Sequence, residues 1–530
     1  MQRAEELSFL KLSWREISIR KKQARHPKLP KRDSLYYVVK TDFRLVPVSH
    51  ISEFELMKKH RLFGPAILVT AAFIGPGTVV TASRAGSDFG FLLLWAIGFS
   101  VLATVVLQEM AARVGVVTGQ GLSHVIKNAI DNPIFRFGIL GLILIAILIG
   151  NSAYQTGNIL GAAAGLEAII PVGNSDLSSN PLEGSNATPN QSSDQSLNFK
   201  VLIVSLVAAV TLTVIWIGRV DLLQKILTVC VGLMSCLFLY SAIASEPQWS
   251  KIAAGFVPRV PSGSEWFVIG IIGTTVVPYN LFLHASAAAQ QWGGDSVNDD
   301  TTTAIKYSRI DTILSVALGG LVTCAILITA SMAFHDTNTP SGSGGLDIAK
   351  QLEPALGVNS KFIFSLGLFA AGLTSAITAP VAAAFAVSGC FGWSGRLSDS
   401  RLKITASVVV LIGFAFAIWL GKSPQQTIIL AQAANGLLLP LLAILLLVIC
   451  NQKSVMKRFQ NRKLSNGLGI LILLITAVIA VNQMNSVIKK VRQIANPTNT
   501  SAIGVSLEDS KANTNNQQQR ISASRMVNQI

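Results

Sequence analysis

The residues with the clearest chemical potential lie where a long apolar stretch is interrupted. Residues 67–86 are apolar enough to cross a bilayer, yet Gly75, Pro76 and Gly77 lie in the middle of them. Two glycines and a proline favour an unwound segment over a continuous helix. Lipid cannot satisfy the peptide groups freed by such a break, so these groups must be buried in protein or line a polar cavity. The pattern predicts a site where backbone groups and Thr78 can bind a small solute.

A second apolar stretch, residues 267–289, is interrupted in the same way. The break and the peptide groups beside it involve Thr275, Val277, Pro278, Tyr279 and Asn280. Paired broken helices are typical of inverted-repeat secondary transporters, in which half-helix ends at mid-membrane contribute partial charges and bare peptide groups to the cargo. For either break taken alone, a proline kink in an ordinary span is the alternative interpretation.

The composition predicts a membrane protein. Half of the residues are hydrophobic and only 13% are charged, and many windows hold the roughly 20 apolar residues that cross the hydrocarbon. The net charge of +16 is concentrated in the N-terminal tail and in loops, where topology accounts for it, so nucleic-acid binding is not indicated. The sequence contains no phosphate loop, hydrolytic triad or zinc spacing. We therefore expect neither an enzyme nor a bound cofactor.

Eleven membrane spans are predicted from the apolar stretches. They are residues 65–86, 91–113, 136–168, 199–218, 221–244, 266–290, 308–334, 361–391, 402–421, 425–450 and 466–484. The two broken spans lie five spans apart, so residues 65–245 and 266–450 are expected to form inverted repeats. The predicted fold is an all-α polytopic membrane protein of the inverted five-helix-repeat transporter class, with helices 1 and 6 broken.

The transporter domain is predicted to cover residues 61–488. It follows a basic cytosolic tail, residues 1–60, and precedes a polar tail, residues 489–530, which we expect to be disordered. Lys and Arg occur in every second connection, whereas the longest loop on the other side, residues 171–198, has none. The positive-inside rule then places the N-terminus in the cytoplasm. We expect the inner or plasma membrane of a prokaryote, with the bilayer and a small inorganic ion as partners and the oligomeric state left open.

Four motifs together give the chain a family resemblance. The second span ends in Gln-Glu-Met-Ala-Ala-Arg-Val-Gly-Val-Val-Thr-Gly at 108–119, and the sixth break continues as Pro-Tyr-Asn-Leu-Phe-Leu-His at 278–284. Ala-Ala-Gly at 370–372 and Leu-Leu-Leu-Pro at 437–440 follow. Over about residues 60 to 450 the sequence closely resembles the Nramp family of divalent-metal transporters. The resemblance implies the inverted-repeat fold and places the tenth helix along the transport pathway.

The sequence departs from the family pattern where the resemblance places the cargo. The first break of the family reads Asp-Pro-Gly-Asn, and its Asp and Asn hold a dehydrated transition-metal ion together with the Met of the sixth break. The corresponding residues here are Gly75, Thr78 and Val277. A centre without a carboxylate or a thioether leaves the desolvation of the ion uncompensated. We therefore expect no site of the transition-metal type and no high-affinity manganese or iron transport.

The positions that the resemblance assigns to proton handling have changed as well. The family's His after the helix-six proline is Tyr279, and the acidic pair on helix three is replaced by Gln155 and Asn158. None of these side chains exchanges a proton near neutral pH. Sodium is the coupling ion we expect instead, because helix eight carries hydroxyls where sodium-coupled members of the wider fold use them. These residues are Thr374, Ser375 and Thr378. Packing of small hydroxyl residues between helices is the alternative.

A site without the acid favours an anion, because the positive N-terminal ends of the half-helices are no longer neutralised. Arg84, late in helix one, can attract anions into the outer vestibule. Its alternative role is a pair with Asp88 at the membrane surface. The anion that we favour is bicarbonate, which is small, planar and able to both donate and accept hydrogen bonds.

The main hypothesis is therefore sodium-driven transport of bicarbonate by alternating access. The expected binding groups come from both breaks: Gly75, Gly77, Thr78, Thr275, Val277, Tyr279 and Asn280. One alternative is a divalent cation, Mg²⁺ or Mn²⁺, coordinated through water that it retains in a wider site. A second alternative is a sensor that has kept the scaffold without transporting.

Overall fold

The structure is a computed structural model. It describes residues 36–38, 45–47, 74–170, 189–218, 220–293, 299–335, 349–353, 357–393, 399–420 and 424–495. The chain divides into two units, Met1–Arg61 and Leu62–Ile530. In the first unit, strands β1 (Tyr36–Val38) and β2 (Leu45–Pro47) pair antiparallel. The rest of the predicted basic tail lies outside the described residues, and its cytosolic location stays a prediction.

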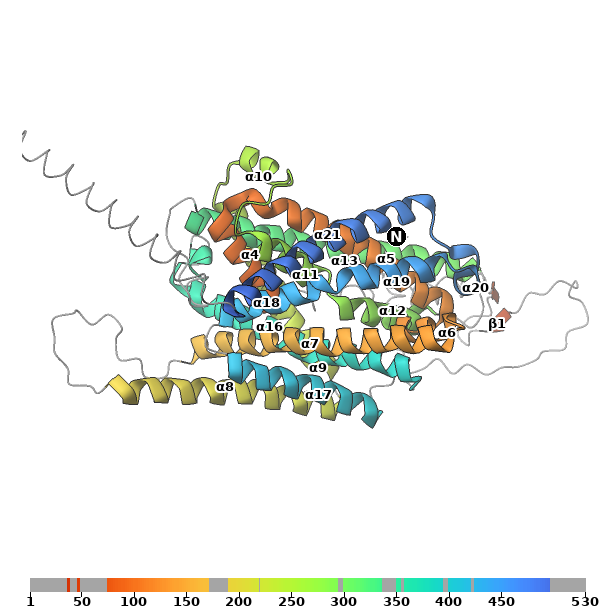
Figure 1. Ribbon diagram of the computed structural model, residues 1–530, viewed down its shortest axis with the longest axis horizontal. Helices are drawn as coiled ribbons and strands as arrows, with labels where there is room; N and C mark the ends of the chain where they lie inside the picture. The colour runs from red at the N-terminus through yellow and green to blue at the C-terminus, as the bar shows by residue number, and fades with distance from the viewer. Residues whose placement is uncertain are drawn as a thin grey trace, which may run out of the picture. The chain divides into compact units, whose positions relative to one another are not determined.

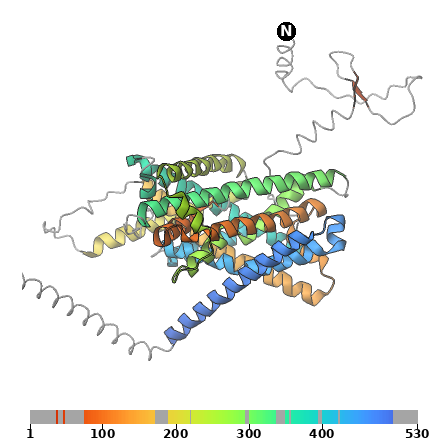
Figure 2. The ribbon, with the colours of Figure 1, turned by 90° about the horizontal axis from the view of Figure 1, so that it is seen from above.

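The second unit is built from helices whose long members run in roughly the same direction (Figures 1 and 2). They are α4 (Pro76–Phe89), α5 (Leu94–Thr118), α6 (Leu122–Ala129), α7 (Pro133–Ile169), α8 (Pro189–Ile217), α9 (Val220–Ala244), α10 (Trp249–Gly255), α11 (Glu265–Thr275), α12 (Pro278–Trp292), α13 (Asp299–Ala330), α16 (Ser360–Phe391), α17 (Ser400–Leu420), α18 (Pro424–Leu437), α19 (Leu439–Asn451), α20 (Lys453–Met456) and α21 (Lys463–Ala495). Short helical turns also occur: η2 (Gly90–Leu93), η3 (Ser331–His335), η4 (Ala349–Leu352), η5 (Gly357–Asn359) and η6 (Lys457–Phe459).

Long apolar helices confirm that this is a multi-pass membrane protein. Within the described part of the chain, nine helical segments are long and apolar enough to cross a membrane. One of them, Pro76–Thr118, contains α4, η2 and α5 in succession. The number of eleven spans stays a prediction, because residues 65–73, the expected first half of span one, lie outside the described residues.

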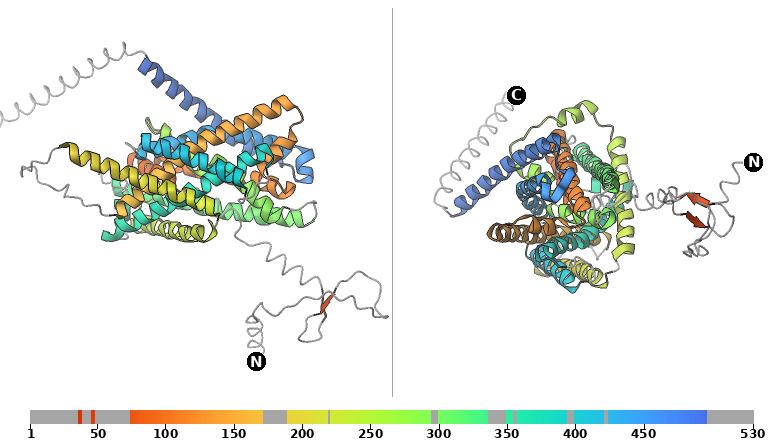
Figure 3. Two further views of the ribbon diagram at one scale, coloured as in Figure 1. Left: turned by 90° about the horizontal axis from the view of Figure 1, so that it is seen from below. Right: turned by 90° about the vertical axis from the view of Figure 1, so that its right-hand side faces the viewer.

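Helix packing follows the symmetry that an inverted repeat requires. In such a repeat each helix has a counterpart five spans away: α4 corresponds to α12, and α5 to α13. The contact of α5 with α12 therefore corresponds to the contact of α13 with α4, and both contacts are present. Likewise α7 packs against α17 and α16 against α8, while α7 packs against α18 and α16 against α9. Two helices that are each other's counterparts in the two repeats also lie side by side, as α7 and α16 do and as α8 and α17 do (Figure 1). The inverted five-helix-repeat fold is thus confirmed, and Figure 3 shows the bundle nearly end-on.

The predicted tenth span, residues 425–450, corresponds to the membrane-spanning segment Gln426–Asn451, which a turn at Leu438 divides into α18, ending at Leu437, and α19, beginning at Leu439. Pro440 explains the interruption, because it has no N–H to donate to the preceding turn and its ring conflicts with the carbonyl four residues earlier. The C-terminal tail was expected to begin at residue 489, yet α21 continues to Ala495. The rest of the predicted tail lies outside the described residues.

Candidate functional site

The first break places the start of α4 against two other helices. Gly75 is the extended N-cap residue and Pro76 occupies the first turn, where a missing N–H costs nothing. A Cβ at Gly75 would lie 2.7 Å from Ser375 Oγ, and a Cβ at Gly77 would lie 2.1 Å from Gln432 Nε2. The absence of side chains at both positions therefore lets α16 and α18 contact the beginning of α4.

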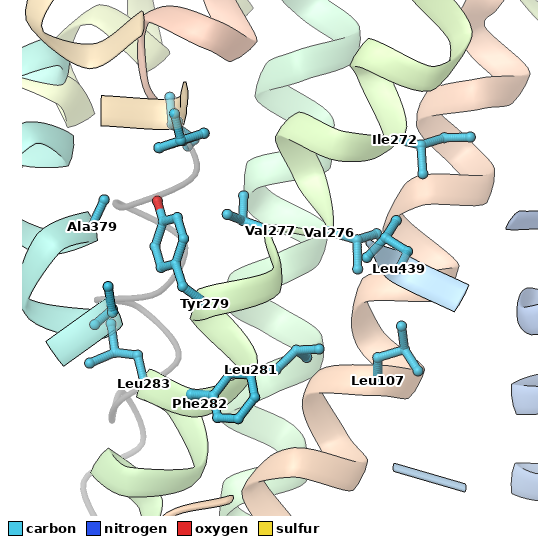
Figure 4. Packing of buried hydrophobic residues seen from close by; sticks show 14 of the residues in the cluster. Leu107, Ile272, Val276, Val277, Tyr279, Leu281, Phe282, Leu283, Ala379 and Leu439 are labelled. Atoms are coloured by element: carbon cyan, nitrogen blue, oxygen red, sulfur yellow. The ribbon is translucent and has the colours of Figure 1, made fainter. Parts of the chain in front are cut away.

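The sixth break is a short extended segment between α11 and α12. The N–H of Val276 still donates to the carbonyl of Ile272 at 2.9 Å, and the N–H of Asn280 donates to the carbonyl of Val277 at 3.1 Å. The side chains of Val276 and Val277 point to different sides of the break, the first toward Leu439 and the second toward Tyr279 (Figure 4). Val277 thus contributes an apolar side chain to the core, and the carbonyl that we expected to bind solute already accepts one hydrogen bond.

A pair of threonines joins the two breaks. Thr78 Oγ1 on α4 and Thr274 Oγ1 on α11 are 2.9 Å apart, and both residues are buried. The roles of Thr78 and of the peptide group of Thr275 in binding solute stay predictions; the side chain that meets Thr78 is that of Thr274. The Thr275 hydroxyl donates to the Ile271 carbonyl of its own helix at 2.9 Å. Neighbouring helix positions point about 100° apart, and two consecutive threonines give no sequence signal for which one faces α4.

Three buried amide side chains on the helices that carry or pack against the breaks have polar atoms without a hydrogen-bond partner among the described residues. Both polar atoms of the Asn280 and Gln432 side chains lack a hydrogen-bond partner in the described part of the chain, and both residues are fully buried. Asn151 on α7 has the same property. A buried polar group without a partner costs about 1–3 kcal/mol. These amides, on α12, α18 and α7, are therefore suited to water or a bound solute.

Tyr279 lies in the same region and packs against a second tyrosine. Its ring meets that of Tyr154 edge-on, with centroids 5.3 Å apart. It extends from α12 toward the side of Ala379 on α16 (Figure 4). The Tyr154 hydroxyl in turn lies 3.6 Å from the position that a Cβ on Gly75 would take. The aromatic pair thus connects the sixth break to the first.

The remaining predicted positions are held in contacts between helices or within one. Gln155 Nε2 on α7 donates to the Ala376 carbonyl on α16 at 3.0 Å, and Asn158 Nδ2 lies 3.5 Å from Gln155 Oε1. The hydroxyls of Thr374 and Thr378 donate to carbonyls of their own helix, at 2.7 and 2.9 Å. Such internal bonds are usual for hydroxyls on apolar helices. Ser375, the middle residue of the three on helix eight, lies against Gly75 at the first break, and sodium binding by these three residues stays a prediction.

Arg84 is held by the neighbouring acid. Its Nη2 lies 3.4 Å from Asp88 Oδ2, and the two side chains are 26% and 31% exposed. This is the pairing that the sequence offered as an alternative to a vestibule role. The vestibule role itself stays a prediction.

A second group of ion pairs lies in the C-terminal part of α5. Glu109 contacts Arg113 on the same helix at 3.2 Å and Arg309 on α13 at 2.7 Å. The Arg113 side chain is only 7% exposed, so it depends on its partners for compensation of its charge.

Replacing Glu109 with Gln is expected to lower the free energy of unfolding by about 3 kcal/mol, because it leaves the buried Arg113 without a counter-charge. Arg84→Gln removes the more exposed pair and should cost below about 1 kcal/mol. Chemical unfolding of both variants in the same detergent checks the difference. Equal losses would show that Glu109 does not compensate the Arg113 charge.

The chemistry of the site is that of neutral oxygen and nitrogen groups. Across the described ranges, no group of three or more His, Cys, Asp or Glu residues could hold a metal ion. Hydroxyl, amide and peptide oxygens are hard ligands that suit small ions able to keep part of their water.

Broken helices from two inverted repeats, meeting at a buried polar junction, define the fold of a secondary active transporter. Within this class the chain belongs to the Nramp family: the family pattern described as "Natural resistance-associated macrophage protein-like" matches residues 66–486. The similarity thus covers both predicted repeats and the greater part of α21.

Named relatives agree with this membership. The chain is 24% identical over 440 residues to the divalent metal cation transporter MntH of Staphylococcus saprophyticus, covering 80% of this chain and 91% of the relative. It is 25% identical over 436 residues to MntH of Staphylococcus aureus strain JH9, covering 79% and 89%. A solved variant of the Eremococcus coleocola manganese transporter has the same fold, with a TM-score of 0.62 at 22% identity, covering 83% and 89%.

These relatives overturn the prediction of a sodium-driven bicarbonate transporter. They are named as divalent metal cation and manganese transporters, which supports the alternative of a divalent cation. The error came from the inference that a site without carboxylate and thioether must reject metal ions. That inference applies to an ion stripped of its water, whereas an ion that keeps water needs less compensation from the protein.

Proposed function

We propose that this chain is a secondary active transporter of a divalent metal cation, Mg²⁺ or Mn²⁺, which it binds at the two helix breaks with part of the water shell retained. The names of the relatives support the class of cargo. The buried junction of α4, α11 and α18 supports the place of binding.

The unsatisfied amides carry this proposal. Asn280 and Gln432 each offer a carbonyl oxygen that is buried and lacks a partner among the described residues. Gln432 lies directly against Gly77, beside the Thr78–Thr274 pair. Amide and hydroxyl oxygens can accept from the water bound to a hard cation as well as contact the cation itself. A neutral ligand set compensates less charge than a carboxylate does, so we expect weaker binding than at a charged site.

The orientation of the protein is also part of the proposal. Basic residues concentrate in alternate connections, and the positive-inside rule places those connections and the N-terminus in the cytoplasm. A prokaryotic inner or plasma membrane suits this arrangement.

Uptake into proteoliposomes loaded with a metal-sensitive dye tests the function directly. We expect saturable entry of Mg²⁺ or Mn²⁺ into vesicles that contain the protein, and none into empty vesicles. Vesicles that hold correctly inserted protein yet admit neither ion would overturn the proposal.

Thr78→Val is expected to reduce this uptake about tenfold, because it removes a hydroxyl at the junction while keeping the side-chain shape. Thr323→Val is the matched control: Thr323 is equally buried, and its hydroxyl donates to the Gly319 carbonyl of its own helix. Initial uptake rates and thermal unfolding of both variants check the prediction. A similar loss of uptake in both would mean that the Thr78 effect arises from stability and not from the site.

A further inference from the structure

The turn between α19 and α21 is strongly basic. Five residues within 453–463 carry a positive charge and are exposed: Lys453, Lys457, Arg458, Arg462 and Lys463. The sequence from 451 to 482 contains no Asp or Glu. We call residues 453–463 the basic turn. The stretch thus carries five positive charges and no negative one of its own, which makes the basic turn a concentrated group of positive charges.

The basic turn is fixed to the helices beneath it. Arg113 on α5 donates to the Phe459 carbonyl at 2.9 Å and also to Asn461 Oδ1. Asn461 Nδ2 donates to Asn466 Oδ1 at 2.8 Å, and Asn466 is bonded in both directions to Asn451 at 2.8 Å. This amide chain joins the last residue of α19 to the first turn of α21. The backbone that carries the cations is therefore already ordered, so binding of a ligand costs less conformational entropy of the protein.

The position of the basic turn relative to the membrane follows from the helices on either side. Gln426–Asn451 and Lys463–Asn482 are both long and apolar enough to span a bilayer. The segment between two consecutive spans lies at the membrane surface, where headgroups are found. Leu464, next to Lys463, is 74% exposed and can reach the acyl boundary.

We propose that the basic turn binds the headgroups of anionic phospholipids. Its charge is complementary to phosphate, its cations lie at headgroup level, and an exposed leucine adjoins them. The positive-inside rule explains the sign of these charges but requires no fixed arrangement of the turn. The hydrogen bonds of Arg113 and of the asparagine chain provide that arrangement. The proposal concerns a surface away from the helix breaks and does not depend on which ion is transported.

The test measures which lipids stay with the full-length protein. The protein is reconstituted in phosphatidylcholine with or without phosphatidylglycerol, extracted gently, and its retained lipid is quantified by mass spectrometry. We expect phosphatidylglycerol to be enriched over its proportion in the bilayer. The triple variant Lys457→Gln, Arg462→Gln and Lys463→Gln should lose this enrichment about tenfold or more, since each cation near an anionic surface contributes to binding.

A matched control neutralises three exposed cations elsewhere: Lys251→Gln, Arg259→Gln and Lys361→Gln. Lys251 and Arg259 lie near the start of α5, because α10 packs on Phe91 and the Arg259 carbonyl accepts from Trp95. The basic turn contacts the other end of α5 through Arg113. The control should keep its phosphatidylglycerol.

Three outcomes would overturn the proposal. Equal enrichment in the wild type and the triple variant would remove the basic turn as the site. Equal loss in the control would show a general charge effect. Displacement of phosphatidylglycerol by excess inorganic phosphate at constant ionic strength would indicate a site for free phosphate and not for lipid. Should the triple variant fold poorly, raising the salt concentration with the wild type gives the same answer, because headgroup binding must weaken as charges are screened.

Discussion

Gly273→Ala is expected to lower the free energy of unfolding by about 3 kcal/mol and to abolish uptake of the cation, because the new methyl group has no space. A Cβ at Gly273 would lie 2.0 Å from the Gln432 carbonyl oxygen and 2.6 Å from the Gly436 nitrogen. Both are backbone atoms of α18, which cannot rotate away as a side chain can. The residue after Gly273 is Thr274, so a displacement of α11 also shifts the α11 member of the Thr78–Thr274 pair.

Gly232→Ala is the control for this substitution. Gly232 lies in α9, and a Cβ there would meet nothing within 4 Å. Alanine in an open helical position stabilises by up to about 1 kcal/mol relative to glycine. Chemical unfolding of both variants, with uptake measured in parallel, separates crowding from a general glycine effect. Wild-type stability in Gly273→Ala would mean that α11 and α18 are not packed as closely as the structure has them.

The sequence alone was sufficient for the scaffold because its signals are local. Pro76 and Pro278 each interrupt a long apolar stretch, and they predicted two helix breaks five spans apart. In the structure, α4 begins at Pro76 and α12 begins at Pro278. Length and apolar composition located the membrane helices. Pro440 carried the same kind of signal, but the interruption that it causes between α18 and α19 was not predicted.

The side chains that meet at the site could not be read from the sequence, because they depend on which side of a helix faces inward. Thr274 meets Thr78, and Ser375 lies against Gly75. Neighbouring hydroxyl residues give no periodic signal that distinguishes them. The prediction of bicarbonate was wrong for another reason. The absence of the family's Asp, Asn and Met indicates that a dehydrated transition-metal ion is bound less tightly, but it does not indicate which ion is transported. The names of the relatives are what supports a divalent metal cation as the proposed cargo.

Introducing a carboxylate at the first break is expected to raise the affinity for Mn²⁺ only when space is made for it. In the double variant Gly75→Asp and Ser375→Ala, we expect the dissociation constant to fall about tenfold or more, because a buried carboxylate attracts a divalent ion far more strongly than neutral oxygens do. In the wild type, Ser375 Oγ lies 2.7 Å from the position of the new Cβ, whereas Ser375 Cβ lies 3.5 Å away. Alanine at 375 keeps the second contact and removes the first.

The two single variants make the prediction specific. Gly75→Asp alone must displace the Ser375 hydroxyl, so we expect a smaller gain in affinity together with a loss of stability. Ser375→Ala alone adds no ligand and should bind Mn²⁺ as the wild type does. The effects of the two substitutions are then not additive, and a double-mutant cycle measures the coupling between positions 75 and 375.

Charge and shape are separated by a further pair of substitutions. Gly75→Asn with Ser375→Ala has nearly the same shape as the acidic double variant but no negative charge, so its affinity for Mn²⁺ should remain well below that of the acidic one. Isothermal titration in detergent gives both constants. If the two double variants bind Mn²⁺ equally, electrostatic compensation at residue 75 does not set the affinity. The neutral ligands of α12 and α18 would then determine it, and Asn280→Leu and Gln432→Leu become the decisive substitutions.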